Sequence, residues 1–190
     1  MSNFLRPRLG GQNVLVMIQN LSMNPFATEN KIVTLEKLLP IIVQLKLDNK
    51  RIVTTNGCFD IIHPGHIVNL EWARSQGDVL IVGINSDESI RKIKGDKRPI
   101  VKELDRARVL AGLAMVDYVF VFNETNASGW LSKVHPRIHV KGKGSENDPL
   151  LIDERKIVEK DGGELRFDPY SKDYATTDII TAILEKHKNK

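Results

Sequence analysis

Short apolar stretches alternate with amphipathic stretches along most of this chain, and this alternation constrains its fold more than any other feature. The stretches that we expect to form strands are residues 51–54, 79–84, 118–122, 138–140 and 165–167. Helical patterns cover residues 35–45, 105–115, 151–160 and 177–187. Such alternation predicts right-handed crossovers and a parallel sheet with helices on both faces. The sequence therefore predicts a doubly wound, Rossmann-like α/β fold with about five strands.

Several residues mark where the predicted helices begin and end. Thr34 is a suitable N-cap for the first helix, and Pro40 falls in that helix's second turn, where it can produce a kink. Ser86 can cap a helix that continues through Ile90. Two glycines, 162–163, stop the helix that precedes the last strand.

Length and composition exclude several classes of protein. The chain has 190 residues, which suits one domain, and its single cysteine cannot form a disulfide within the chain. We expect a cytoplasmic protein, since this cysteine usage fits a reducing compartment and no run of about 18 apolar residues could span a membrane. The net charge is +4, but no aromatic side chains interleave with the basic ones, so we expect no nucleic-acid partner.

Residues 1–30 differ from the rest of the chain, and we expect an N-terminal extension followed by one catalytic domain over residues 31–190. An apolar run, Val14 to Ile18, lies within the extension and is too short and too polar at its flanks for a signal peptide. We interpret the extension as a segment that packs on the body or on a second subunit; disorder is the alternative.

The segment that follows the first strand carries the strongest chemical signal. His63 and His66 are three residues apart, so both can lie on one side of a first helical turn that Pro64 favours. Free N–H groups at a helix start favour an anion, and Gly57 and Gly65 permit close backbone approach. Zinc ligation by the two histidines is the competing interpretation, but Cys58 is the only cysteine and nothing nearby completes a tetrahedral set.

The segment resembles the His-x-Gly-His region of the cytidylyltransferase-like nucleotidyltransferases. Other short stretches narrow the resemblance to the adenylyltransferase domain that activates heptose 1-phosphate. These stretches are residues 31–36, 55–60, 85–87, 94–95 with 98–99, 105–106 and 140–142. The resemblance runs in order from about residue 31 to the C-terminus.

This resemblance implies the roles of individual residues. His63, His66 and Lys94 would be catalytic. The nucleotide would contact Asn56, Gly57, Cys58, Phe59, Gly65, Arg106, Lys141, Gly142, Thr176 and Thr177. The sugar phosphate would contact Asp60, Asn85, Asp87 and Arg98.

Each of these roles has a simpler alternative. The basic stretch around Lys94, with Arg91, Lys92, Lys97, Arg98 and Lys102, could be a solvated surface loop. Arg106 could form a surface salt bridge of little energetic value. Asp87 could cap a helix, and the hydroxyls of Thr176 and Thr177 could do the same at the last helix.

The resemblance implies ATP and a sugar 1-phosphate, heptose 1-phosphate above all, as substrates, with Mg²⁺ bridging phosphates and an ADP-sugar for surface polysaccharide as product. Residues 143–148 depart from the family pattern, which places the choice of base or acceptor in question. The alternatives are an enzyme that uses CTP and glycerol 3-phosphate, and a regulator that binds nucleotide without turnover. Relatives of this kind are commonly dimeric, so we expect a homodimer.

Overall fold

A computed structural model describes residues 28–149, 151–170 and 175–188. Five parallel strands form one sheet in the order β3-β2-β1-β4-β5. The strands are β1 (Ile52–Gly57), β2 (Val79–Asn85), β3 (Tyr118–Phe122), β4 (Ile138–Lys141) and β5 (Glu164–Phe167). This sheet confirms the predicted doubly wound α/β fold, and its strand order reverses direction between β1 and β4.

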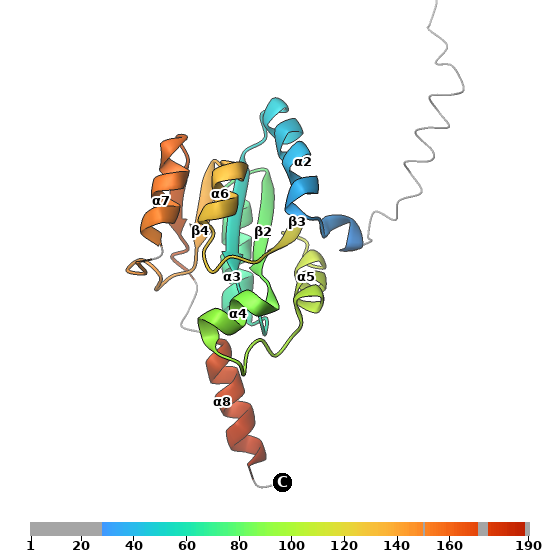
Figure 1. The fold of residues 1–190 in the computed structure, drawn as a ribbon, viewed down its shortest axis with the longest axis vertical. Coiled ribbons are helices and arrows are strands. Elements are labelled where there is room, and N and C mark those ends of the chain that lie inside the picture. Colours follow the sequence, from blue (N-terminus) through green and yellow to red (C-terminus); the bar gives the residue numbers. More distant parts are fainter. Residues whose placement is uncertain (1–27, 150, 171–174, 189–190) are drawn as a thin grey trace, which may run out of the picture.

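Helices cover both faces of the sheet (Figure 1). The helical elements are η1 (Thr28–Lys31), α2 (Leu35–Leu47), α3 (Pro64–Ser75), α4 (Asp87–Lys94), α5 (Glu103–Ala111), α6 (Ser128–Val134), α7 (Leu151–Lys160) and α8 (Thr176–His187). Helices α3 and α5 bury residues such as Leu70 and Leu110 against one face. Helices α2, α6 and α7 bury residues such as Leu38, Trp130 and Val158 against the other.

The predicted caps are present. The Thr34 hydroxyl accepts a hydrogen bond from the Lys37 backbone N–H at 3.4 Å, and the Ser86 hydroxyl accepts one from Ser89 N–H at 3.2 Å. Helix α2 continues through Pro40. Gly162, with a φ of 76°, lies just after α7, as expected for a glycine that ends a helix.

Some boundaries differ from the predictions. Strand β1 extends three residues beyond Thr54, and α5 begins at Glu103 and ends at Ala111 rather than covering 105–115. Gly112 follows α5 directly, and glycine weakens a helix interior because it loses the most backbone freedom there. Helix α6 has no counterpart in the sequence prediction.

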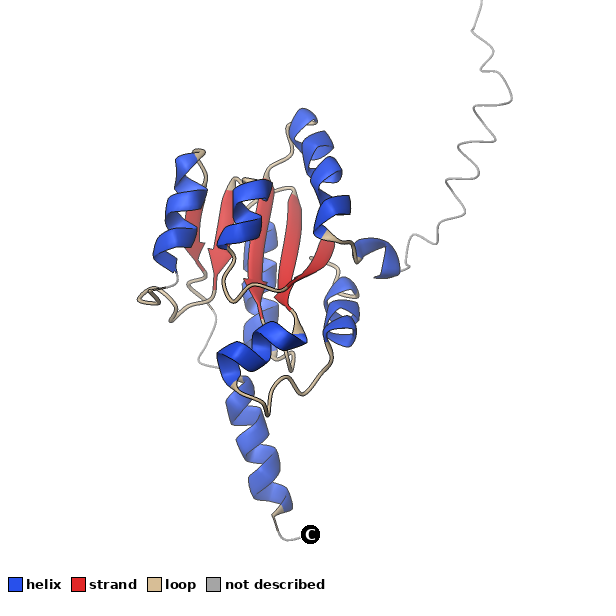
Figure 2. Cartoon of the chain, viewed as in Figure 1, coloured by secondary structure: helices blue, strands red, loops and turns tan. Residues whose placement is uncertain are grey.

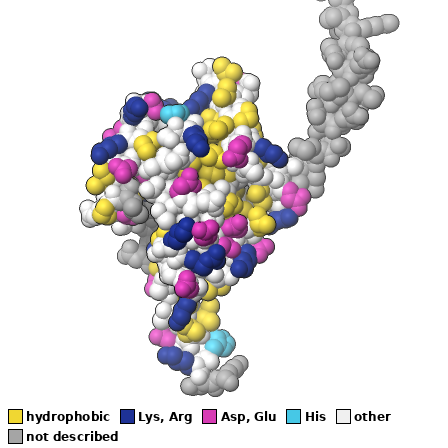
Figure 3. Space-filling view, in the orientation of Figure 1, with side chains coloured by type: hydrophobic (Ala, Val, Ile, Leu, Met, Phe, Trp, Pro, Cys, Tyr) yellow, Lys and Arg dark blue, Asp and Glu magenta, His cyan; other side chains and the backbone are white. Residues whose placement is uncertain are grey.

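The carboxyl ends of the strands, marked by the arrowheads in Figure 2, face α4 and the beginning of α8. Helix α8 extends away from the body of the domain and buries none of its residues. Apolar side chains remain on its surface (Figure 3), with Ile183 and Leu184 52% and 59% exposed.

No helix among the described residues is long and apolar enough to cross a membrane. Residues 1–27 of the predicted extension, which covers residues 1–30, lie outside the described residues. The described part of the chain begins at Thr28, and Ile32 pairs with Val119 at the β3 edge of the sheet.

Candidate functional site

The loop after β1 folds back tightly at the carboxyl edge of the sheet. Phe59 adopts a left-handed conformation with a φ of 47°, which is uncommon for a residue with a side chain. A Cβ atom at position 57 would lie 3.2 Å from the Phe59 ring. Glycine at 57 therefore leaves room for the ring, which in turn packs against His66 with centroids 5.0 Å apart.

The two histidines of the motif stack on each other at the start of α3. Their ring centroids are 3.7 Å apart and their planes differ by 23°. His63 occupies the N-cap position and Pro64 begins the helix, as the sequence predicts. Pro64 has no N–H and the N–H groups of His66 and Ile67 bond to the His63 carbonyl, so the Gly65 N–H and the two imidazoles are the donors gathered at this helix start.

Burial favours the neutral form of both imidazoles. Burial lowers the pKa of His66 to about 4, with a further lowering from the neighbouring His63. Burial also lowers the pKa of His63, although Asp178 opposes that shift. Each neutral ring carries one N–H donor, which can bond an anionic oxygen without requiring an extra proton.

A cavity of about 350 Å³ opens beside these rings at the point where the strand order reverses. Its lining combines the β1 loop, the start of α3, the end of α4, the residues after β4 and the start of α8. Thirteen of the residues proposed from the sequence line it: Asn56, Gly57, Cys58, Phe59, Asp60, His63, Gly65, His66, Lys94, Arg98, Gly142, Thr176 and Thr177. Ligands of doubly wound folds bind at such a reversal.

The cavity carries an excess of positive charge. Lys94, Arg98 and Lys143 line it, and Asp60 is the only carboxylate among the lining residues of the described chain. Two helix N-termini, those of α3 and α8, add partial positive charge. This combination favours a ligand with several negative charges, such as a di- or triphosphate.

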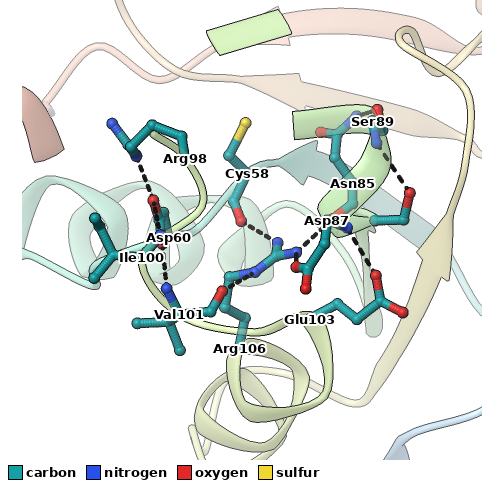
Figure 4. Close-up of polar contacts among 11 residues, drawn as sticks. Cys58, Asp60, Asn85, Asp87, Ser89, Arg98, Ile100, Val101, Glu103 and Arg106 are labelled. Atoms are coloured by element: carbon teal, nitrogen blue, oxygen red, sulfur yellow. Dashed lines mark hydrogen bonds and ion pairs between the residues drawn. The ribbon is translucent and has the colours of Figure 1, made fainter. Parts of the chain in front are cut away.

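Asp60 holds the segment that follows α4 against this site (Figure 4). Its carboxylate accepts hydrogen bonds from the backbone N–H groups of Ile100 and Val101, each at 2.8 Å, and pairs with Arg98. Although burial raises the pKa of Asp60, these hydrogen bonds lower it below its ordinary value. Asp60 thus lines the cavity with a carboxylate that protein groups already bind, and its contact with substrate stays a prediction.

Arg106 is 1% exposed, and its guanidinium bonds to neighbouring groups of the protein (Figure 4). The guanidinium donates to the carbonyl oxygens of Val101, Cys58 and Asn85 at 3.0, 2.5 and 2.8 Å, and to the Asp87 carboxylate at 2.9 Å. The structure therefore places Arg106 behind the cavity wall, where it ties three loops together. Its predicted contact with the nucleotide would require a rearrangement.

Three further predicted residues do not line the cavity. The Asn85 side chain donates to the Ser89 hydroxyl and the Glu124 carbonyl. Asp87 pairs with Arg106. Lys141 turns its ammonium toward Glu154 and Asn56, so that it lies under the cavity rather than in it.

Four cavity residues were absent from the sequence prediction: Thr55, Asn69, Lys143 and Ala175. Asn69 follows His66 by three residues, so the helical period alone places it on the same face. Its Nδ2 atom is buried without a hydrogen-bond partner among the described residues, which makes it a donor available to a ligand. Lys143 lies in the stretch where the family pattern is lost, and no pattern identified it.

Cys58 lines the cavity as a thiol rather than a thiolate. Burial raises its pKa, and this outweighs the opposing influence of the nearby Lys94, Arg106 and Arg98. No group of three His, Cys, Asp or Glu side chains within the described ranges could hold a metal ion.

The fold and the cavity together define a nucleotidyltransferase-type Rossmann-like protein. The model of the cytidylyltransferase-like family matches residues 54–182, and the chain belongs to that family. The chain is 39% identical over 160 residues to the bifunctional protein HldE of Pelobacter propionicus, an alignment that covers 84% of this chain and 32% of that protein. The chain thus spans about a third of the length of the curated relatives it matches.

Two solved structures share the fold. The lipopolysaccharide core biosynthesis protein of Thermoplasma volcanium is 27% identical with a TM-score of 0.52, and the match covers 62% of this chain and 93% of that one. Pantoate-beta-alanine ligase of Francisella tularensis is 16% identical with a TM-score of 0.56, over 84% of this chain and 79% of that one. The second likeness is one of fold alone.

Proposed function

We propose that this chain transfers AMP from ATP to a sugar 1-phosphate, heptose 1-phosphate in the first instance, and releases pyrophosphate. The observation that carries the proposal is the convergence of the stacked His63–His66 pair, Lys94 and two helix N-termini on one cavity. The resemblance to heptose 1-phosphate adenylyltransferases and the likeness to a lipopolysaccharide core biosynthesis protein support the choice of sugar. The product would be an ADP-sugar for surface polysaccharide.

The reaction is an in-line displacement. An oxygen of the sugar 1-phosphate forms a bond to the α-phosphorus of ATP while the bond from that phosphorus to the bridging oxygen of the β-phosphate breaks. The attacking oxygen is already an anion at neutral pH, so no general base is required. The barrier is then mainly charge repulsion and misalignment, which positioned donors reduce.

Different groups of the cavity would bind the phosphates and stabilise the developing charge. His63 and His66 would donate hydrogen bonds to the oxygens of the α- and β-phosphates. Lys94, Arg98 and the N-termini of α3 and α8 would stabilise the negative charge that develops on pyrophosphate. Mg²⁺ would enter with ATP as part of the substrate and neutralise phosphate charge.

Pyrophosphate release over a panel of nucleoside triphosphates and sugar phosphates tests the proposal. We expect release to require a sugar 1-phosphate and Mg²⁺, with ATP the best nucleotide. A preference for CTP by about tenfold would replace the adenylyltransferase assignment but keep the displacement mechanism. Absence of turnover with every sugar or polyol phosphate would leave a nucleotide-binding regulator.

We also propose that the chain works as a homodimer. Helix α8 presents Ile183 and Leu184 to solvent, and exposed apolar side chains of this kind often mark an interaction surface. The mass of the protein in solution, before and after removal of residues 1–28, tests both the dimer and the contribution of the N-terminal extension.

A further inference from the structure

A buried carboxylate lies on α7, on the side of the sheet away from α3. Glu154 is 2% exposed and shares the inward face of α7 with Leu151 and Val158. A charge in such a position is costly unless other groups compensate for it. Its partners therefore indicate why a carboxylate occupies a place that a leucine would fill.

Glu154 has three polar neighbours. Its Oε1 accepts a hydrogen bond from the Ala127 backbone N–H at 2.9 Å, and its Oε2 lies 2.7 Å from Lys141 Nζ. His139 Nε2 is 3.7 Å from the same oxygen. Burial raises the pKa of Glu154, but His139 and Lys141 outweigh it and bring the pKa to about 2, so the group is ionised.

Lys141 connects the Glu154 carboxylate to a residue of the cavity. Besides this ion pair, its ammonium donates a hydrogen bond, 2.8 Å long, to Oδ1 of Asn56, a residue that lines the cavity. An ammonium group has only donors, so the atom of Asn56 that faces it must be the carbonyl oxygen. The NH₂ group on the other arm of the amide is then left for a ligand.

We propose that Glu154 is a positioning residue, which holds Lys141 so that Asn56 presents its NH₂ group to an oxygen of the bound nucleotide. The inference rests on the proposed function, because it takes the occupant of the cavity to be a nucleotide. Every oxygen of a triphosphate accepts hydrogen bonds, so the NH₂ group of Asn56 can donate to it. If the amide were rotated, its own oxygen would face the phosphate oxygens, and two acceptors would repel each other. The orientation of one amide thus decides between attraction and repulsion.

The charge of Glu154 is what keeps Lys141 in this place. Lys141 lies at the end of β4 with an 11% exposed side chain, close to a cavity intended for anions. Without a compensating carboxylate, the ammonium would lose its closest anionic partner and the Asn56 amide would lose its fixed donor. Glu154→Gln keeps the size of the side chain and its carbonyl acceptor for Ala127, but it removes the charge and turns an NH₂ donor toward the Lys141 ammonium.

The experiment compares Glu154→Gln with Glu159→Gln, a matched control at an exposed position of the same helix. In the pyrophosphate-release assay, we expect Glu154→Gln to raise the KM for ATP about tenfold, as for loss of one well-placed hydrogen bond, with kcat changed less than about threefold. Lys141→Met removes the donor itself and should raise the KM equally. The double variant Glu154→Gln/Lys141→Met buries no unpaired charge, so it keeps the test available if either single variant does not fold.

A second measurement needs no substrate. In a ¹H–¹⁵N spectrum, the ammonium of Lys141 should be visible because it is buried and hydrogen-bonded, and Lys141→Met identifies its signal. We expect Glu154→Gln to abolish that signal and to shift the side-chain NH₂ signals of Asn56, while Glu159→Gln leaves both unchanged.

The two measurements separate the inference from the proposed function. A wild-type protein that turns over no nucleotide removes the proposed function, and the spectra alone then decide the positioning role. Unchanged Lys141 and Asn56 signals in Glu154→Gln would overturn the inference. A KM for ATP in Glu154→Gln that equals the wild-type value would also overturn the inference. A KM below the wild-type value would overturn it too, because it would mean that the released Lys141 binds phosphate itself.

Discussion

The carboxylate of Asp60 should contribute to stability rather than to contact with substrate, and Asp60→Asn tests this. The side chain is fully buried, and it receives two backbone N–H groups and the Arg98 guanidinium. Asparagine keeps one acceptor oxygen, but an NH₂ group takes the place of the other oxygen. This NH₂ group is a donor, so it cannot accept the hydrogen bond that the replaced oxygen accepted. The substitution also removes the charge that pairs with Arg98.

The expected loss can be estimated from these contacts. Breaking a fully buried ion pair by removing one partner costs roughly 3–5 kcal/mol. The Arg98 side chain is 15% exposed, so water can partly compensate it, and the lower end of that range applies. We expect a loss of about 3 kcal/mol, which corresponds to a fall in melting temperature of roughly 6–12 °C for a domain of this size.

Thermal and urea unfolding of Asp60→Asn, with Asp96→Asn as the control, provides the measurement. Asp96 is exposed on the same segment, so its substitution should change little. The KM for ATP should rise as well, because Arg98 belongs to the segment that Asp60 holds, Lys94 directly precedes that segment, and both residues line the cavity. If Asp60→Asn is as stable as Asp96→Asn, the carboxylate is not the anchor that its contacts indicate.

Three further predictions concern the cavity. His63→Ala or His66→Ala should lower turnover roughly 10²-fold or more, because each substitution removes one donor to the transition state. The melting temperature should change little. Near-normal turnover in either variant would contradict the phosphate-binding role of that histidine. The pKa of His66, lowered to about 4, implies that the unfolded chain takes up a proton before the folded one does. The free energy of unfolding should therefore be constant above about pH 6.5 and fall by up to about 1.4 kcal/mol per pH unit for this group as the pH drops toward 4. Urea titrations at several pH values should give a shallower dependence for His66→Ala, and parallel profiles would contradict the shift. Cys58→Ser should keep most activity and alkylation of the wild type should be slow, since burial raises the thiol pKa; rapid, inactivating alkylation at neutral pH would indicate a reactive thiolate.

The sequence predicted those features that depend on local spacing. The period of the helix and the place of Pro64 were enough to put His63 and His66 together, and apolar runs were enough to locate the five strands. Helix α6 was missed because it has only seven residues and no side-chain cap, so neither its periodicity nor its start could be recognised.

The direction in which a long polar side chain turns depends on tertiary contacts, and the prediction was weakest there. Arg106 was expected to reach the nucleotide, yet it turns inward, as its place one helical turn before the buried Leu110 could have indicated. Glu154 gave a similar signal, because it lies between Leu151 and Val158 at the spacing of a buried helix face. A charged residue at such a spacing predicts a buried ionic contact, but its partner comes from another part of the chain.

If a nucleotide binds in the cavity as proposed, the stability of helix α8 should depend on the nucleotide concentration. It buries no residue of its own, while its first residues, Thr176 and Thr177, line the cavity. A nucleotide that bonds these residues would bind the ordered helix and not a frayed one, and would stabilise it by an amount that grows with the logarithm of nucleotide concentration. Amide hydrogen exchange over residues 176–187 should then slow as ATP is added, whereas exchange in β1 and β2 should not change. Part of the nucleotide's binding energy would then be used to order α8. A variant with a more stable α8 would therefore bind ATP more tightly, although it makes no new contact with ATP.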